Sequence, residues 1–164
     1  MNKVLLLVPC IQYGGTETVA IRYYKELTNN NIVVDLLSIV SSKNLPKNTK
    51  YIFNEKSYIY KILTKKLLRP IFYLVVFLNY IKPTFNCNTI ICFGELPIFC
   101  SFLNVFFYKK FLNLRSKKFI SSFRNHPSTI SKKKQNLLVK VFNSFDLNTT
   151  NSSIATNFLK ERCN

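Results

Sequence analysis

The chain has 164 residues, of which 48% are hydrophobic and 19% are charged. This balance is typical of one globular domain with a hydrophobic core, and it excludes a disordered, collagen-like or coiled-coil chain. Lysines and arginines number 24 against seven acids, and the formal net charge of +17 favours polyanions or an anionic lipid surface as partners without constraining the fold.

The N-terminal segment reads as a strand, a glycine turn and the start of a helix. Residues 3–9 are a short apolar run that ends in proline, as expected of a strand buried on both faces of a parallel sheet. Gly14 and Gly15 then permit a tight backbone turn, and Thr16 or Glu17 is expected to cap the helix that follows.

Apolar residues at helical spacing continue to Leu27, and the asparagines at 29–31 end this helix. A run rich in β-branched residues at 32–40 predicts a second strand. Strand, helix and strand together make a βαβ unit.

The rest of the chain continues to alternate short apolar strands with helices. Further strands are predicted at 51–53, 89–93, 118–123 and 146–150. Further helices are predicted at 59–81, 96–108, 132–145 and 152–162. Pro70 is expected to divide the first of these into two helices, and Lys82 with Pro83 is expected to end it.

This alternation predicts an α/β fold with a Rossmann-like, doubly wound, mostly parallel sheet flanked by helices, in a single domain that spans residues 1–164. No internal repeat or linker composition divides the chain. In such sheets, ligands bind outside the carboxyl ends of the strands. Four polar clusters follow predicted strands and are therefore expected to converge on one edge; they lie at 13–17, 95, 124–126 and 151–153.

The turn at 14–17 has two interpretations. Its backbone N–H groups and the positive end of the helix dipole make a suitable cradle for a phosphate. It is also compatible with a structural turn that lets the helix pack close to the first strand, and it matches neither a Gly-x-Gly-x-x-Gly motif nor a P-loop. Asp35 has about the spacing of a ribose-binding acid, but it falls inside the second predicted strand, which disfavours a nicotinamide enzyme.

Charged residues at other strand ends are candidate ligand contacts. Glu95 interrupts an apolar stretch, so it is expected to face a cleft or to pair with a base, and a favourable acid at a helix N-terminus explains it as well. Arg124 could clamp a phosphate or a carboxylate, or simply lie on the surface. His126 is the only histidine, and its place beside Pro127 favours a polar loop residue over a general base.

The cysteines and apolar runs bear on the compartment of the protein. The five cysteines include no Cys-x-x-Cys pair, so no zinc or redox site is predicted, and the thiols are expected to be buried and reduced. No secretory leader is evident, and the apolar segments 71–78 and 90–107 are too short or too interrupted to span a bilayer. We therefore expect a cytoplasmic protein, with peripheral attachment to the inner face of a membrane left open.

The order of these motifs resembles the N-terminal, acceptor-side half of family 4 retaining glycosyltransferases, which have the GT-B fold. The strand at 3–9, the Gly-Gly-Thr-Glu turn at 14–17 and the Val-Val-Asp-Leu-Leu strand at 33–37 are similar to the opening of that family. The segment 119–125 is similar to the family's strand that leads into an Arg-Asn pair, and 145–152 is similar to its strand that ends in serine.

This resemblance implies transfer of a hexose from a nucleotide sugar to a saccharide or lipid-linked acceptor, without an essential metal or other cofactor. Surface polysaccharide or lipopolysaccharide synthesis is the usual setting for the family. The glycine turn would approach the donor phosphates and the sugar, and other residues would line the acceptor side. By this resemblance the substrate-binding residues are Gly14, Gly15, Thr16, Glu17, Glu95, Arg124, Asn125 and Ser152.

Two departures from the family pattern affect these expectations. The chain has Gly94 and Glu95 at a position where members often have a histidine. It has Arg124 at a second position where many members have a histidine. The family also continues into a second domain that holds the nucleotide sugar, and these 164 residues contain no counterpart of it. We therefore expect the chain to be inactive alone, either as a truncated form or as the partner of a separate C-terminal-domain chain.

Two other classes of function remain open. Lys61, Lys65 and Lys66, with the lysines at 132–134, could hold a non-catalytic module on an anionic membrane surface, where each such charge contributes about 1 kcal/mol. A solvated helix face explains the same lysines. A basic RNA-binding module is the other class, but the sequence has no aromatic nucleic-acid motif, and we expect no nucleic acid partner.

Overall fold

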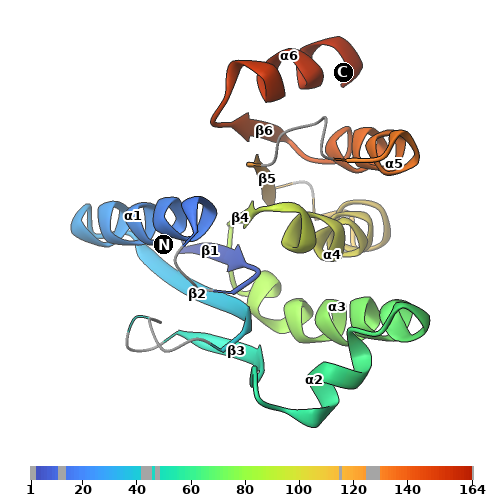
Figure 1. The fold of residues 1–164 in the computed structure, drawn as a ribbon. Coiled ribbons are helices and arrows are strands. Elements are labelled where there is room, and N and C mark those ends of the chain that lie inside the picture. Colours follow the sequence, from blue (N-terminus) through green and yellow to red (C-terminus); the bar gives the residue numbers. More distant parts are fainter. Residues whose placement is uncertain are drawn as a thin grey trace.

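The computed structural model describes residues 3–10, 14–41, 46, 49–114, 116–124 and 130–163. Within these residues, six strands form one parallel sheet in the order β3-β2-β1-β4-β5-β6 (Figure 1). The strands are β1 (Lys3–Val8), β2 (Val33–Val40), β3 (Lys50–Phe53), β4 (Thr89–Phe93), β5 (Lys118–Phe123) and β6 (Leu147–Thr150). The predicted α/β fold is confirmed, and this strand order is the one typical of Rossmann folds.

Helices cover both faces of the sheet. Figure 1 shows α1 (Gly15–Asn29) on one side and α3 (Arg69–Phe85), α4 (Glu95–Phe106) and α5 (Lys132–Phe142) together on the other. Crossovers between parallel strands are right-handed. A helix whose crossover leads toward the β3 edge of the sheet therefore lies on the opposite face from helices whose crossovers lead toward the β6 edge. The shorter elements are α2 (Tyr58–Leu63), the 3-10 helix η1 (Lys66–Leu68), the π-helix η2 (Phe107–Phe111) and α6 (Ser153–Arg162).

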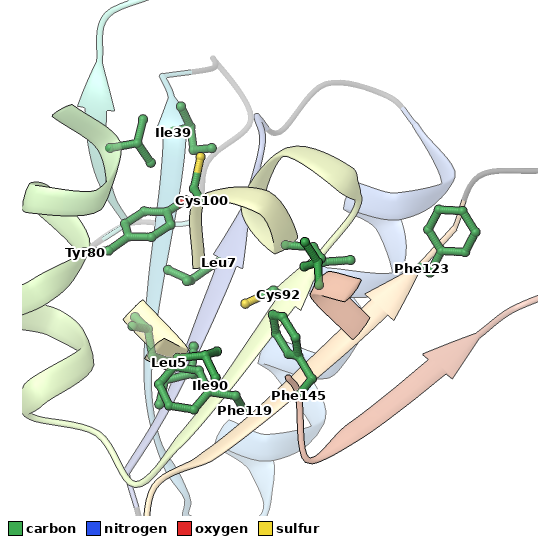
Figure 2. Packing of buried hydrophobic residues seen from close by; sticks show 14 of the residues in the cluster. Leu5, Leu7, Ile39, Tyr80, Ile90, Cys92, Cys100, Phe119, Phe123 and Phe145 are labelled. Atoms are coloured by element: carbon green, nitrogen blue, oxygen red, sulfur yellow. The ribbon is translucent and has the colours of Figure 1, made fainter. Parts of the chain in front are cut away.

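Alternate residues of the central strands build two cores, one on each face. Leu5 and Leu7 of β1 point into the larger core, together with Ile90 of β4 (Figure 2). Leu6 and Val8 point into the smaller core beneath α1. All of these side chains are fully buried. Burial on both faces explains why the central strands read as continuous apolar runs instead of alternating with polar residues.

The helical segment after β3 differs from the prediction in two details. The segment is divided as predicted, but the division falls at 64–65. Pro70 lies in the first turn of α3, where an amide would have no acceptor within the helix, so the proline costs no helical hydrogen bond. The expected end at Lys82 and Pro83 is wrong, because α3 continues through Pro83 to Phe85. A proline here gives up the hydrogen bond of its own amide, and its ring crowds the carbonyl group four residues earlier, but the helix ends two residues later.

The prediction that the cysteines are buried is confirmed for three of the five. All five are free; Cys87, Cys92 and Cys100 are buried, whereas Cys10 and Cys163 are partly exposed. Burial raises the pKa of the Cys92 thiol to about 12, and it also raises the pKa of Cys100. These thiols are therefore protonated at neutral pH and act as small apolar side chains.

Candidate functional site

The three glycines of the chain all lie at the carboxyl edge of two adjacent strands. Gly14 and Gly15 precede and begin α1 after β1, and Gly94 joins β4 to α4. β1 and β4 are hydrogen-bonded neighbours, with β2 and β3 on one side of them and β5 and β6 on the other. This is the topological switch point, where open α/β sheets bind their ligands.

Gly94 lies close to the first turn of α1. Its backbone angles, φ 80° and ψ 168°, lie in a region that only glycine adopts readily. A Cβ atom at this position would lie 3.5 Å from Cγ2 of Thr16, in the first turn of α1. The amide of Gly94 donates a hydrogen bond of 3.0 Å to the carbonyl oxygen of Ser122 in β5. The turn after β4 thus lies between the N-terminus of α1 and the end of β5.

The N-terminus of α1 has no side-chain cap. Gly14 is the N-cap residue, and the amide and the hydroxyl of Thr18 both donate to its carbonyl oxygen, at 3.1 and 2.9 Å. The prediction that Thr16 or Glu17 caps this helix is wrong, because the helix starts at Gly15 and both residues lie inside it. The N–H groups of Gly15, Thr16 and Glu17 have no acceptor within the helix, and the space beside Gly15 is open. These donors and the positive end of the dipole suit an anion.

The carboxylate of Glu17 occupies part of this position. A Cβ atom on Gly14 would overlap Oε2 of Glu17, so the carboxylate lies directly against the N-cap residue. An acid in the first turn is stabilised by the helix dipole. A phosphate must therefore approach over Gly15 or displace Glu17.

Glu95, the first residue of α4, is paired with a base. Its Oε2 atom accepts a hydrogen bond from Nζ of Lys134 on α5, and its side chain is only 14% exposed. Glu95 also lies at the N-terminus of α4. Pairing with a base and a favourable position at a helix N-terminus, the two structural interpretations of this residue, therefore both apply. The pair borders a groove of about 280 Å³ among α2, α3 and α4, which Tyr60 and Arg69 also line. Glu95 therefore faces the α3–α5 layer.

Arg124 is tied to the end of β5. Its Nε atom donates a hydrogen bond of 2.9 Å to the hydroxyl of Ser122, whose carbonyl oxygen binds the amide of Gly94. Arg124 is half-buried and is thus held near the glycine turns by one shared residue. The predicted contact Asn125 and the loop residue His126 lie outside the described residues.

Ser152 is the N-cap of α6. Its hydroxyl oxygen accepts a hydrogen bond of 3.1 Å from the amide of Ala155. β6 ends at Thr150, which pairs with Phe123 at the end of β5, so Ser152 follows the strand next to the one that leads into Arg124. The structure gives this serine a capping role at the predicted edge.

The structure brings together part of the predicted set. Gly15, Thr16 and Arg124 are linked through Gly94 and Ser122, neither of which we predicted as a site residue. Glu95 follows β4 as predicted but turns toward the helices opposite α1. Gly94 had a detectable signal, a glycine at a strand end, whereas the pairing of Glu95 with a lysine on another helix has no local signature.

Asp35 lies away from this edge. Its carboxylate forms an ion pair of 2.8 Å with Nζ of Lys3, near the start of β1, and this hydrogen bond raises the pKa of Lys3. The carboxylate of Asp35 is therefore not available at the tip of β2 to bind a ribose, as expected from its position inside the strand. Across the described residues, no group of three or more histidine, cysteine, aspartate or glutamate side chains is arranged to hold a metal ion.

Comparisons with known proteins bear on the fold. No protein-family model matches the sequence, and no curated protein matches it. Among solved structures, the chain is similar to an alpha-glucosyltransferase determined in complex with UDP and a 13-mer DNA containing a central A:G mismatch. The TM-score is 0.55 at 12% sequence identity, over 92% of this chain.

The chain has a glycosyltransferase-like Rossmann fold. At this level of identity the similarity concerns the fold alone. The aligned region makes up 37% of the alpha-glucosyltransferase chain, so this domain corresponds to a minor part of that protein.

Proposed function

We propose that this domain is the acceptor-side half of a glycosyltransferase that moves a hexose from a nucleotide sugar to a saccharide or lipid-linked acceptor. A family 4 retaining enzyme of surface polysaccharide or lipopolysaccharide synthesis fits the order of its motifs. The observation that carries the proposal is the close approach of two glycine turns at the switch point, with no described atom within 4 Å of a Cβ position on Gly15 at the helix N-terminus. The glycosyltransferase-like fold supports it.

The geometry supports a division of roles at this edge. The amides of Gly15 and Thr16 are placed to receive negative charge on the donor phosphates, and preorganised donors of this kind stabilise a departing diphosphate. Arg124 supplies a cation held by Ser122 near the same turn. We place the acceptor beside Arg124 and Glu95, with Asn125 and Ser152 as its further contacts. No metal or cofactor is needed for this arrangement to orient two substrates.

A second part is required to complete the cleft. The similarity covers 37% of the alpha-glucosyltransferase, and we propose that a nucleotide-sugar-binding part, in the same polypeptide or in another, forms the opposite wall. The residues 1–164 by themselves are then expected to bind substrates weakly and not to catalyse transfer.

Titration of the labelled 164-residue chain with UDP-glucose and GDP-mannose, followed by amide chemical shifts, tests the site. We expect the largest shifts at Gly15 and Thr16. Arg124→Ala should weaken binding about tenfold, whereas Arg22→Ala, an exposed arginine on α1, should leave it unchanged. Binding that leaves Gly15 and Thr16 unperturbed and ignores Arg124→Ala would contradict the proposed site.

A transfer assay with radiolabelled nucleotide sugar tests the division into halves. No product is expected from the isolated chain, and product is expected when a nucleotide-sugar-binding partner chain is added. Turnover by residues 1–164 alone would show that the domain is a complete enzyme, which the proposal excludes.

A further inference from the structure

An exposed apolar stripe runs along α3. Ile71, Leu74 and Leu78 follow one another at helical spacings, which places them on one side of the helix. Their side chains are 48%, 50% and 55% exposed. The opposite side of α3 is buried against the sheet. α3 therefore has a second apolar side that the described chain leaves uncovered.

The stripe continues onto α4 and η2. The rings of Phe77 on α3 and Phe107 on η2 meet at 6.3 Å, and Phe107 stacks on Phe111 at 5.6 Å. Leu103, Phe106 and Phe111 are exposed, Phe111 to 76%. We define the apolar helix face as the exposed side chains Ile71, Leu74, Leu78, Leu103, Phe106 and Phe111. Exposed apolar side chains gathered on neighbouring helices mark an interaction site.

The helical layer that carries this face is rich in basic residues. Residues 58–111 contain seven lysines and arginines and a single acid, Glu95, which is paired with Lys134; of the seven, Lys109 is paired with Asp146 of the following segment. α5 beside them contributes four lysines and no acid. α1, on the other face of the sheet, has as many acids as bases. Positive charge is thus concentrated on the layer that carries the apolar helix face, and Nζ of Lys110 lies 5.5 Å from the ring centroid of Phe106 within it.

We propose that the apolar helix face docks on an anionic lipid bilayer, with its apolar side chains among the acyl chains and the lysines of the same layer on the lipid phosphates. Surface helices that combine exposed apolar and basic residues bind membranes in this way. A nucleic acid would engage the lysines but would gain little from exposed leucines. No helix in the described part of the chain is long and apolar enough to cross a membrane, so the contact lies at the bilayer surface. Docking does not depend on sugar transfer.

A groove connects this face with the candidate site. An apolar groove of about 390 Å³ lies between α3, α4 and α5, and Leu103 of the apolar helix face lines it. It shares Tyr73, Phe99 and Lys134 with the groove that borders Glu95. Docking would place the end of the apolar groove near Leu103 at the bilayer. Under the proposed function, a lipid-linked acceptor would reach Glu95 along the two connected grooves.

Co-sedimentation of the 164-residue chain with vesicles tests the proposal. Vesicles of phosphatidylglycerol and phosphatidylcholine are compared with vesicles of phosphatidylcholine alone, at low and high salt. We expect binding to the anionic vesicles to be at least about tenfold tighter and to weaken as salt is raised.

Two variants and a matched control locate the contact. Leu74→Ser with Leu78→Ser, and separately Lys82→Glu with Lys110→Glu, should each weaken binding by about tenfold or more. Leu147→Ser with Ile154→Ser removes two side chains of equal exposure, 54% and 52%, from β6 and α6 and should bind as wild type. Thermal unfolding by circular dichroism checks that each variant is folded.

Several outcomes would overturn docking. These are equal binding to neutral vesicles, binding unaffected by the Leu74→Ser and Leu78→Ser pair in a folded protein, and equal loss in the control variant. A concentration-dependent dimer that the same pair abolishes, without vesicle binding, would assign the face to a second copy of the chain. Salt-sensitive binding to an RNA oligonucleotide without vesicle binding would assign the basic layer to nucleic acid.

Discussion

Nζ of Lys117 lies 2.6 Å from the carbonyl oxygen of Cys87, just beyond the end of α3. The same ammonium group donates to the carbonyl oxygens of Thr84 and Phe85, at 2.9 and 2.8 Å. The last carbonyls of a helix lack intrahelical partners, so one lysine satisfies three acceptors at this terminus. Lys117 is only 8% exposed, and burial lowers its pKa from the ordinary value.

Replacement of this lysine should destabilise the fold. Lys117→Met keeps the aliphatic stem but removes the ammonium donor from the three carbonyl oxygens, of which that of Thr84 keeps a hydrogen bond from the amide of Cys87. We expect the free energy of unfolding to fall by about 2–3 kcal/mol. Lys118→Met, at the exposed neighbouring position, should change it by less than about 0.5 kcal/mol. Urea unfolding measures both, and equal values for the two variants would show that the capping interaction contributes nothing.

The glycines at the switch point should differ sharply in their tolerance of a side chain. Gly94→Ala forces alanine into a glycine-only region of backbone angles and should cost about 1–3 kcal/mol of folding stability. Gly15→Ala meets open space in the first turn of α1 and should be neutral or stabilising by up to about 1 kcal/mol. Thermal unfolding compares them; a Gly94→Ala variant as stable as wild type would contradict the backbone geometry.

The carboxylate of Glu17 should compete with anions at the N-terminus of α1. Glu17→Gln removes a negative charge from the position that a phosphate would take, and we expect the affinity for UDP or pyrophosphate to rise about two- to fivefold. The same change should cost about 0.3–1 kcal/mol of stability, because the acid no longer complements the dipole.

Glu26→Gln, near the other end of α1, is the matched control and should leave anion affinity unchanged. Isothermal titration at low salt measures both variants. Weaker binding by Glu17→Gln would show instead that this carboxylate holds the turn in its binding conformation.

Buried thiols should make the protein sensitive to alkali. Burial raises the pKa of Cys92 to about 12 and that of Cys87 to about 11, from the ordinary value of 9.0. Above pH 9 the folded state therefore holds more protons than the unfolded state, so stability present below that pH is lost as the pH rises toward these values.

The loss should approach about 1.4 kcal/mol per pH unit for each such thiol between its unfolded-state and folded-state pKa values. Urea unfolding in the presence of a reductant, between about pH 9 and pH 11, measures it. In the Cys92→Ala variant, the loss of stability per pH unit should be smaller by the contribution of one thiol. A free energy of unfolding that does not change over this range would contradict the conclusion that these thiols are buried and protonated in the folded state.

The strands followed from local patterns in the sequence. β4 and β5 have the bounds that were predicted for them. β4 is a run of adjacent apolar residues after Thr89, as expected of a strand buried on both faces, whereas β5 also contains Ser121 and Ser122. The convergence of their ends followed as well, since parallel strands share one carboxyl edge. The N-cap of α1 is Gly14, two residues before Thr16 and three before Glu17, because glycine also serves as an N-cap residue.

Side-chain partners could not be derived in the same way. Glu95 was expected to meet a base, but only the packing of α4 against α5 decides that this base is Lys134. Lys117 gave no signal apart from its charge, and its burial depends on where α3 ends. The exposure of one apolar side of α3 could not be derived either, since periodicity does not tell which apolar side of a helix meets the sheet.

The order of residues along the chain was thus enough to establish the alternation of strands and helices, because each element depends on residues close together in sequence. General rules for α/β folds then led from that alternation to a parallel sheet and to the edge at which its turns meet. The close approach of Gly94 to Thr16, the capping by Lys117 and the exposure of the apolar helix face were decided by the folded molecule. They depend on the rotation and register with which distant elements pack, and many residues jointly set that packing.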